Sequence, residues 1–236
     1  MKKLLFGIFA HPDDEAFGPS ASLYQAAQSG TDVHLILLTD GENGNNPDEV
    51  SGLAQVRLKE WEQSGALIGV KSQHALHYPD GGINNNLYLE IAEKIFAVIR
   101  KVLKTYSNEV SVDFMTYEQG GITGHLDHIA ASYITTFVYL KLHEEQSTHH
   151  HIQTLKYYCL PQCLAPETNT SWLYMTCGKA DAHCDEIFDY IELKEIKLKI
   201  MKAHRSQRDD MQAIVRQQTA TNNPCRYKDH FCYFKS

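Results

Sequence analysis

Residues 4–18, LLFGIFAHPDDEAFG, join an apolar run to a cluster of ionisable side chains and then return to apolar residues. The run KLLFGIF at 3–9 has the length and apolar content of a buried β-strand. The apolar residues over 14–30 have helical spacing and predict a helix that ends at a glycine. Between the two lies the string His11, Pro12, Asp13, Asp14 and Glu15. Like charges this close repel one another, so the cluster either lies in water at a loop or is neutralised by a bound cation.

Strand and helix patterns alternate along the chain after this first pair. We predict strands over 32–39, 74–78 and 112–117, and helices over 50–68, 87–104 and 125–142. Such alternation is typical of a parallel sheet with right-handed crossover helices. The sequence therefore predicts an α/β fold, a three-layer, Rossmann-like and mostly parallel sheet with helices on both faces. No linker or internal repeat divides the chain, so we expect a single domain over 1–236.

The last third of the chain has weaker patterns. Strands are predicted over 154–160 and 171–177, and a helix over 193–207. The polar stretch 143–151 ends in three consecutive histidines, and we expect it to be a solvated surface loop rather than a metal site. The tail from Arg208 onward carries no clear pattern.

Composition excludes several classes of partner. The 236 residues are 43% hydrophobic and 22% charged, as in globular proteins, and the net charge of −7 argues against nucleic acid and anionic membranes. No apolar stretch approaches the roughly 20 residues that span a bilayer. The start MKKLLFGIFA resembles a signal peptide, but its apolar run is short and no cleavage site follows. We therefore expect a cytoplasmic protein with a small-molecule substrate, and the sequence leaves a homo-oligomer open.

All six cysteines lie in the last third of the chain. They are Cys159, Cys163, Cys177, Cys184, Cys225 and Cys232. No pair has the C-x2-C spacing of a zinc knuckle, and a chain of this length has little need of disulfides. We expect free, mostly buried thiols in a reducing cytosol, with a second structural metal site as the less favoured alternative.

Polar clusters follow each of the first four predicted strands. They are HPDDE (11–15), TDGEN (39–43), YPDGG (78–82) and EQGGITGHLDH (118–128). Ligands of open parallel sheets bind beyond the carboxyl ends of the strands. His11 and Asp14 are three residues apart, as are His125 and His128. Two imidazoles and one carboxylate, with a fourth position left to water, make up a typical catalytic zinc site. Either cluster alone is also consistent with a turn and an acidic helix start, but the two together favour a metal site.

AHPDDE near the N-terminus and GHLDH about 110 residues later resemble the motifs of the PIG-L/LmbE family of zinc-dependent deacetylases. TDGE, RLKE, YPDGG and KAHRSQ add weaker support. Members of this family remove the acetyl group from N-acetylglucosamine units on various aglycones. The resemblance implies an LmbE-like fold, a hydrolase acting on an N-acetylglucosaminyl conjugate, and a Zn²⁺ cofactor, with Fe²⁺ as the cellular alternative. It makes His11, Asp14 and His128 the metal ligands.

The resemblance also assigns the other roles in the reaction. Asp13 matches the general base, and His125, as a cation, matches the group that holds the oxyanion or protonates the scissile amide. Asp127 matches a residue that orients its neighbours. Arg57 and Asp80 match positions that contact the sugar or its aglycone.

Two positions depart from the family pattern. Leu126 replaces a proline, which changes loop stiffness rather than ligation, and Thr123 stands where some members have a tyrosine that assists at the oxyanion. Two other functions stay open at this point. One is hydrolysis of another amide or ester on the same scaffold, and the other is a non-catalytic domain that binds a sugar or partner and keeps a structural metal. Asp13 beside Asp14 disfavours the second, because a structural site needs no additional base.

Overall fold

The computed structural model describes residues 1–145, 149–165, 177–220 and 223–235. In its N-terminal part the elements are β1 (Lys2–Phe9), α1 (Asp14–Phe17), α2 (Ser20–Gln28), β2 (Asp32–Thr39), α3 (Leu53–Ile68), β3 (Ser72–Tyr78), η1 (Asn85–Leu87), α4 (Tyr88–Leu103), β4 (Val110–Tyr117), α5 (Gly121–Gly124) and α6 (Leu126–Glu144). The predicted alternation of strands and helices is confirmed, close to the predicted bounds. The helix predicted over 14–30 is two helices, because Gly18 and Pro19 interrupt it.

The described C-terminal part adds three strands, of which β6 and β7 are antiparallel, two α-helices and short 3-10 helices labelled η. The elements are β5 (His150–Cys159), η2 (Gln162–Leu164), η3 (Asp181–His183), β6 (Glu186–Asp189), η4 (Ile191–Leu193), α7 (Lys194–Met201), η5 (Arg205–Gln207), α8 (Arg208–Thr219) and β7 (Lys228–Tyr233). The predicted strand over 154–160 corresponds to β5, whereas the one predicted over 171–177 lies, apart from Cys177, outside the described residues. Among the described helices, none is both long and apolar enough to cross a bilayer.

The strands form one sheet in the order β3-β2-β1-β4-β5-β7-β6. The first five are parallel, and β7 and β6 are added antiparallel. This confirms the Rossmann-like, mostly parallel sheet. The chain moves outward from β1 through β2 to β3 and then returns to the other side of β1 as β4, so β1 and β4 are neighbours at the point where the direction of winding reverses. The loops after these two strands carry the two histidine clusters.

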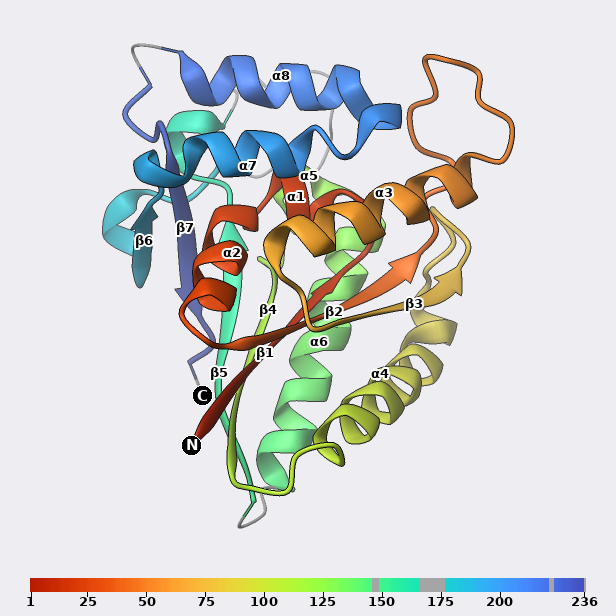
Figure 1. The fold of residues 1–236 in the computed structure, drawn as a ribbon, viewed down its shortest axis with the longest axis vertical. Helices are drawn as coiled ribbons and strands as arrows, with labels where there is room; N and C mark the ends of the chain where they lie inside the picture. Colours follow the sequence, from red (N-terminus) through yellow and green to blue (C-terminus); the bar gives the residue numbers. More distant parts are fainter. Residues whose placement is uncertain (146–148, 166–176, 221–222, 236) are drawn as a thin grey trace.

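Helices cover both faces of the sheet, as predicted (Figure 1). Alternate residues of β1 divide between the two sides, as the period of a strand requires. Leu4, Phe6 and Ile8 belong to the core that α4 and α6 complete, and Leu5 and Phe9 belong to the core beneath α2, α3 and α7. Burial on both faces explains why β1 and β2 are almost continuously apolar.

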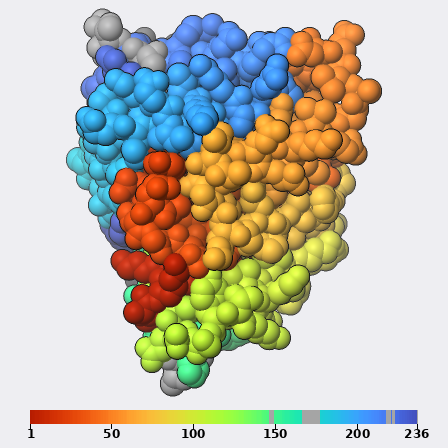
Figure 2. Space-filling model, in the orientation of Figure 1, coloured from red at the N-terminus to blue at the C-terminus, as the bar shows by residue number. Residues whose placement is uncertain are grey.

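The loop between β2 and α3 lies against a segment more than 150 residues later in the chain. In the space-filling view the orange region near residue 45 adjoins the blue region near residue 205 (Figure 2). Gln207 Nε2 donates to the carbonyl oxygen of Asn45 over 2.7 Å, and Arg208 pairs with Asp48. The C-terminal segment therefore covers one side of the loop that follows β2.

Two predictions for local structure in the last third are wrong. The stretch 143–151 is not entirely a loop, because His150 and His151 pair with Val110 and Ser111 of β4 as the first residues of β5. The helix predicted over 193–207 ends at Met201, and η5 follows after a turn.

The prediction that all cysteines are free is also wrong. Cys163 and Cys225, which are 62 residues apart, form a disulfide. The remaining cysteines are free: Cys159 is buried, Cys184 and Cys232 are half-buried, and Cys177 is exposed. The disulfide joins η2 to the turn before β7, which are segments without a shared sequence pattern.

Candidate active site

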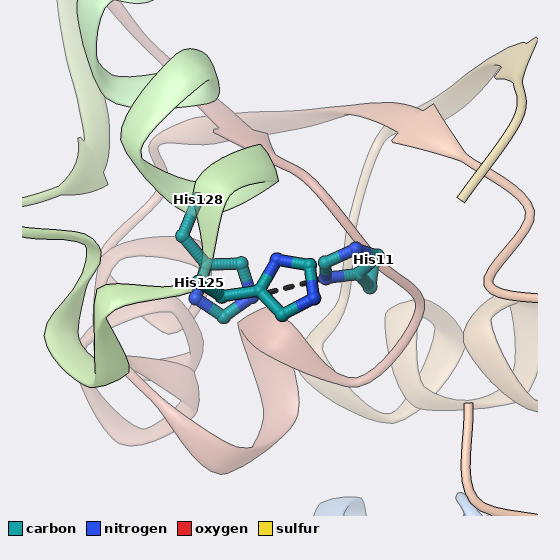
Figure 3. Close-up of side chains that lie close together, drawn as sticks. All are labelled: His11, His125 and His128. Carbon is teal, nitrogen blue, oxygen red and sulfur yellow. Dashed lines mark hydrogen bonds between the residues drawn. The ribbon is translucent and has the colours of Figure 1, made fainter. Parts of the chain in front are cut away.

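The two histidine clusters meet where β1 and β4 end. His11 Nδ1 lies 3.0 Å from His128 Nε2, and that same His128 nitrogen lies 3.2 Å from Asp14 Oδ1. Figure 3 shows the rings of His125 and His128, at the start of α6, close to that of His11 in the loop after β1. The three residues predicted to bind the metal are therefore brought together from segments more than 100 residues apart.

The backbone orients His128 toward this point. Its Nδ1 lies 3.1 Å from the carbonyl oxygen of Gly121, which accepts a hydrogen bond and so places the ring proton on Nδ1. Nε2, which carries the lone pair, is the nitrogen that faces His11 and Asp14, and it accepts a hydrogen bond from His11 Nδ1. Gly121 has φ +67°, and a Cβ there would lie 2.9 Å from the Cβ of His128. The close approach of this turn to His128 therefore requires glycine.

Asp14 is held as an anion with one oxygen directed at the histidines. Its Oδ2 accepts the backbone N–H groups of Ala10 and His11 over 3.0 and 2.9 Å. Burial acts to raise the pKa of Asp14, but His128 and His11 outweigh it and hold the pKa below its usual range. Oδ1 is left to face His128, as a metal-binding carboxylate oxygen would.

His11 is supported on its other side by two carboxylates. Its Nε2 lies 2.9 Å from Asp80 Oδ1 and 3.4 Å from Asp127 Oδ2. Burial lowers the pKa of His11, but the two carboxylates raise it to about 10. A histidine whose outer nitrogen faces carboxylates while the inner one faces other donors is a common arrangement of metal ligands.

The donor set fits a divalent cation. Two ring nitrogens 3.0 Å apart, beside a carboxylate, are donor atoms that one divalent cation can bind, with release of the proton that the two nitrogens share. Ring nitrogens of His11, His125 and His128 lie within 4.8 Å of one another, and so do ligand atoms of His11, Asp80 and Asp127. Two overlapping donor groups therefore share His11.

Asp13 adopts a backbone conformation that L-residues rarely use, with φ 109° and ψ −20°. Its N–H donates to Glu15 Oε2 over 3.3 Å, and its Oδ2 accepts from Arg57 Nη2 over 3.0 Å. Burial raises the pKa of Asp13 to about 6, against the opposing charge of Arg57. The Asp13 carboxylate is therefore held by Arg57, whereas that of Asp14 faces His128.

Arg57 is buried, with 3% of its surface exposed. Its Nη1 donates to the carbonyl oxygen of Gly41 and its Nη2 to that of Pro12, each over 2.6 Å. Asp80 is also buried, and it accepts the backbone N–H of Asn43 over 3.1 Å while it faces His11. Both residues predicted to contact the substrate therefore contact the loops that carry the site.

His125 caps the N-terminus of α6 through its side chain. Its Nδ1 accepts the backbone N–H of Asp127 over 3.2 Å, so the proton of the ring is on Nε2. Burial and the neighbouring His11 and His128 lower the pKa of His125. Both observations favour a neutral ring with Nε2–H as its donor over the cation that the resemblance implies.

Asp127 is anchored rather than solvated. It is 1% exposed, and its two oxygens accept the backbone N–H groups of Gly81 and Ile83 over 2.7 and 3.3 Å. These bonds tie the start of α6 to the loop after β3. Asp127 also faces His11, as an orienting residue does.

The support beneath Asp13 was not predicted from the sequence. Glu15 is fully buried and accepts hydrogen bonds from the Asp13 N–H and from the Ser64 hydroxyl. His204 Nε2 lies 3.0 Å from Glu15 Oε1 and is itself fully buried. The KAHRSQ motif contains this histidine, but no local pattern connects residue 204 with residue 15.

Comparison with known proteins agrees with this geometry. Residues 6–139, more than half of the chain, match the family model described as "PIG-L: GlcNAc-PI de-N-acetylase". Over 103 residues the chain is 42% identical to a diacetylchitobiose deacetylase from Thermococcus kodakarensis, covering 43% of this chain and 38% of that protein. It is 31% identical over 155 residues to a 1D-myo-inositol 2-acetamido-2-deoxy-alpha-D-glucopyranoside deacetylase from Kineococcus radiotolerans, covering 54% of this chain and 42% of that one. These matches span less than half the length of either relative.

A solved structure shares the whole fold. The N,N'-diacetylchitobiose deacetylase from Pyrococcus horikoshii superimposes with a TM-score of 0.68 at 21% identity, covering 99% of this chain and 84% of that one. At this identity the likeness concerns the fold.

Proposed function

Since the chain belongs to the PIG-L family of GlcNAc-PI de-N-acetylases, we propose that it is a metal-dependent N-deacetylase. The substrate is an N-acetylglucosamine-containing small conjugate, and the products are acetate and the free amine. The observation that carries this proposal is the convergence of His11, His128 and Asp14 with Asp13 immediately beside them. An adjacent carboxylate that is not needed as a ligand favours a hydrolytic site over a purely structural one.

His11, His128 and Asp14 would hold the metal, and Zn²⁺ is the ion that this donor set suits best. When bound, such an ion supplies Lewis acidity, which makes water more acidic and the acetyl carbonyl more electrophilic. The carbonyl of Gly121 and the carboxylates of Asp80 and Asp127 fix the orientations of the two histidine rings.

Asp13 is proposed as the general base. It accepts a proton from the attacking water while the water oxygen bonds to the acetyl carbon. Arg57 holds Oδ2 of Asp13, so the carboxylate cannot rotate freely. When the carbon–nitrogen bond breaks, the same proton passes to the departing nitrogen, so that the amine and acetic acid, which ionises to acetate, leave without a net change in the enzyme.

His125 is proposed to stabilise the negative charge that develops on the acetyl oxygen. Its Nδ1 is occupied by the Asp127 N–H, so Nε2–H is the donor available for this role. A neutral donor suits the task, and removing one such donor typically costs about 10²–10³ in rate.

The substrate class rests on the relatives. One relative acts on diacetylchitobiose and another on an N-acetylglucosaminyl inositol. Both of these substrates carry the acetamido sugar at the scissile position. We propose that this chain recognises the same sugar, and that the group attached to the sugar differs from one relative to another.

The proposal is tested with a panel of diacetylchitobiose, N-acetylglucosaminyl inositol, N-acetylglucosamine and a simple acetyl ester, scored by acetate release. Activity on at least one acetamido sugar is expected, with loss on treatment with a chelator and recovery on adding Zn²⁺. Release of acetate from a simple ester but from none of the sugars would favour a different hydrolase. Unchanged activity after complete metal removal would contradict the metal-dependent reaction.

A further inference from the structure

A second group of metal-ligand side chains lies near the paired ends of β5 and β7. Sγ of Cys225, a carboxylate oxygen of Asp181 and a ring nitrogen of His230 are all within 4.8 Å of one another. Cys163 is bonded to Cys225, so its sulfur lies at the same place. None of these residues belongs to the deacetylase site described above.

The backbone brings these four residues together from separate segments. His230 of β7 lies opposite Cys159 of β5 in the antiparallel pair. Gln162 N–H donates to the carbonyl oxygen of Lys179, and Lys179 N–H donates to that of Leu160, each over 2.8 Å. These bonds hold the segment of Cys163 beside the segment that leads into η3, where Asp181 lies.

His230 is the best anchored member. It is fully buried, and its Nε2 lies 3.1 Å from Asp181 Oδ1. Its Nδ1 is buried and has no hydrogen-bond partner among the described residues. An unsatisfied ring nitrogen inside a protein is costly, and it is uncommon where nothing is bound. Cys225 is 4% exposed, whereas the Asp181 side chain is 56% exposed, so the group opens to solvent on one side.

Thiolates, imidazoles and carboxylates are all ligands of Zn²⁺, and two thiolates, one imidazole and one carboxylate supply the four donors of its tetrahedral coordination. We propose that Cys163, Cys225, His230 and Asp181 bind a zinc ion when the disulfide between the two cysteines is reduced. In the oxidised form the sulfurs are bonded to one another and cannot act as thiolates. A bound zinc ion would therefore replace the disulfide as the cross-link between η2 and the turn before β7.

Each step of this exchange is balanced. An external dithiol, small or carried by a protein, reduces the disulfide by two thiol–disulfide exchanges and becomes a disulfide itself. Cys163 and Cys225 each gain one electron and one proton. Zinc then displaces both thiol protons to solvent, with no further change of oxidation state.

Three other thiols lie nearby and are not part of the proposed site. Cys232 interacts with both Cys159 and Cys184, and burial raises the pKa of Cys184 to about 11. Cys184 Sγ also donates to the carbonyl oxygen of Ala180 over 3.6 Å. Cys184 therefore serves as a matched control for a cysteine in the same region.

Cobalt(II) titration of the metal-free, full-length protein tests the proposal. Sulfur ligation to cobalt produces an intense charge-transfer absorption, and the proposed deacetylase site offers only nitrogen and oxygen donors. Protein reduced with a dithiol, which is then removed, should show this absorption and bind two metal equivalents. Oxidised protein should bind one equivalent and show no such absorption. Zn²⁺ should displace the cobalt and abolish the band. Its absence from reduced, folded protein would overturn the site, whether or not the chain is a deacetylase.

Variants assign the ligands. Cys225→Ser and His230→Gln should each reduce the bound metal from two equivalents to one, and Cys225→Ser should remove the sulfur band. Cys184→Ser should retain both. If the band persists in Cys225→Ser, or is lost in Cys184→Ser, the assignment to these four residues is wrong.

Discussion

Arg57 Nη2 lies 3.0 Å from Asp13 Oδ2 and 2.6 Å from the carbonyl oxygen of Pro12. Its other terminal nitrogen lies 2.6 Å from the carbonyl oxygen of Gly41. One guanidinium therefore joins the loop after β2 to the turn in which Asp13 has φ 109°. A planar fork of donors suits this arrangement, because it satisfies a carboxylate and two carbonyl oxygens at fixed angles. We therefore propose that Arg57 positions the proposed base.

Arg57→Lys should lower kcat by about 10- to 100-fold and change KM by less than about two-fold, because misplacing a catalytic group costs rate rather than ground-state binding. Steady-state kinetics on the best substrate of the panel measures the two constants. A large rise in KM at constant kcat would instead mean that Arg57 contacts the sugar or its aglycone directly.

Asp13→Asn should reduce kcat by about 10²–10⁴-fold while the protein keeps its metal, since general-base catalysis typically contributes that much. His128→Ala is the matched variant, because it removes a proposed ligand and should lose the metal as well. Metal analysis beside the activity assay separates the two outcomes. Near-normal turnover by the Asp13→Asn variant would show that another group takes the proton.

The arrangement of the site was predictable from sequence because it depends on topology. Nearly continuous apolar runs at 3–9 and 32–39 indicated strands buried on both faces, and the helical patterns between strands indicated a parallel sheet. In such a sheet the carboxyl ends share one edge, so His11 and His128 could be expected to meet. Their 3.0 Å separation is the consequence of β1 and β4 being neighbours.

The partners of single side chains were not predictable in the same way. Arg57 and Glu15 are joined to Asp13 through a strained turn, and no periodic pattern encodes a φ of 109°. β6 has four residues with alternate partial exposure, too short for a distinct strand pattern. The Cys163–Cys225 disulfide joins residues 62 positions apart, which spacing alone does not determine.

His204→Ala should destabilise the fold by about 3–5 kcal/mol, because it leaves the buried Glu15 carboxylate without its imidazole partner. The contact of His77 with Asp40 provides the control, since the His77 side chain is 60% exposed. His77→Ala should cost less than about 1 kcal/mol. Urea unfolding of both variants gives the two free energies. Equal small losses would mean that the contact between His204 and Glu15 contributes little.

His34 should make the stability of the fold depend on pH below neutrality. It is 2% exposed, with Nδ1 2.7 Å from Ser72 Oγ and Nε2 3.3 Å from the Tyr106 hydroxyl. Burial lowers its pKa from 6.5 to about 4, against the opposing charge of Asp32. The unfolded chain therefore binds the proton more readily than the folded protein, so this contribution to stability is fully present above pH 6.5 and is lost as pH falls toward 4.

The size of this pH effect follows from the uptake of one proton by His34. Between the two pKa values, the free energy of unfolding changes by up to roughly 1.4 kcal/mol per pH unit. His34→Gln keeps a polar side chain but cannot titrate, so its urea unfolding free energy should fall less steeply than that of the wild type from about pH 6.5 to about pH 4.5. Parallel curves for His34→Gln and wild type would mean that His34 carries the same protonation in the folded and unfolded states, and that acid instability arises from other groups.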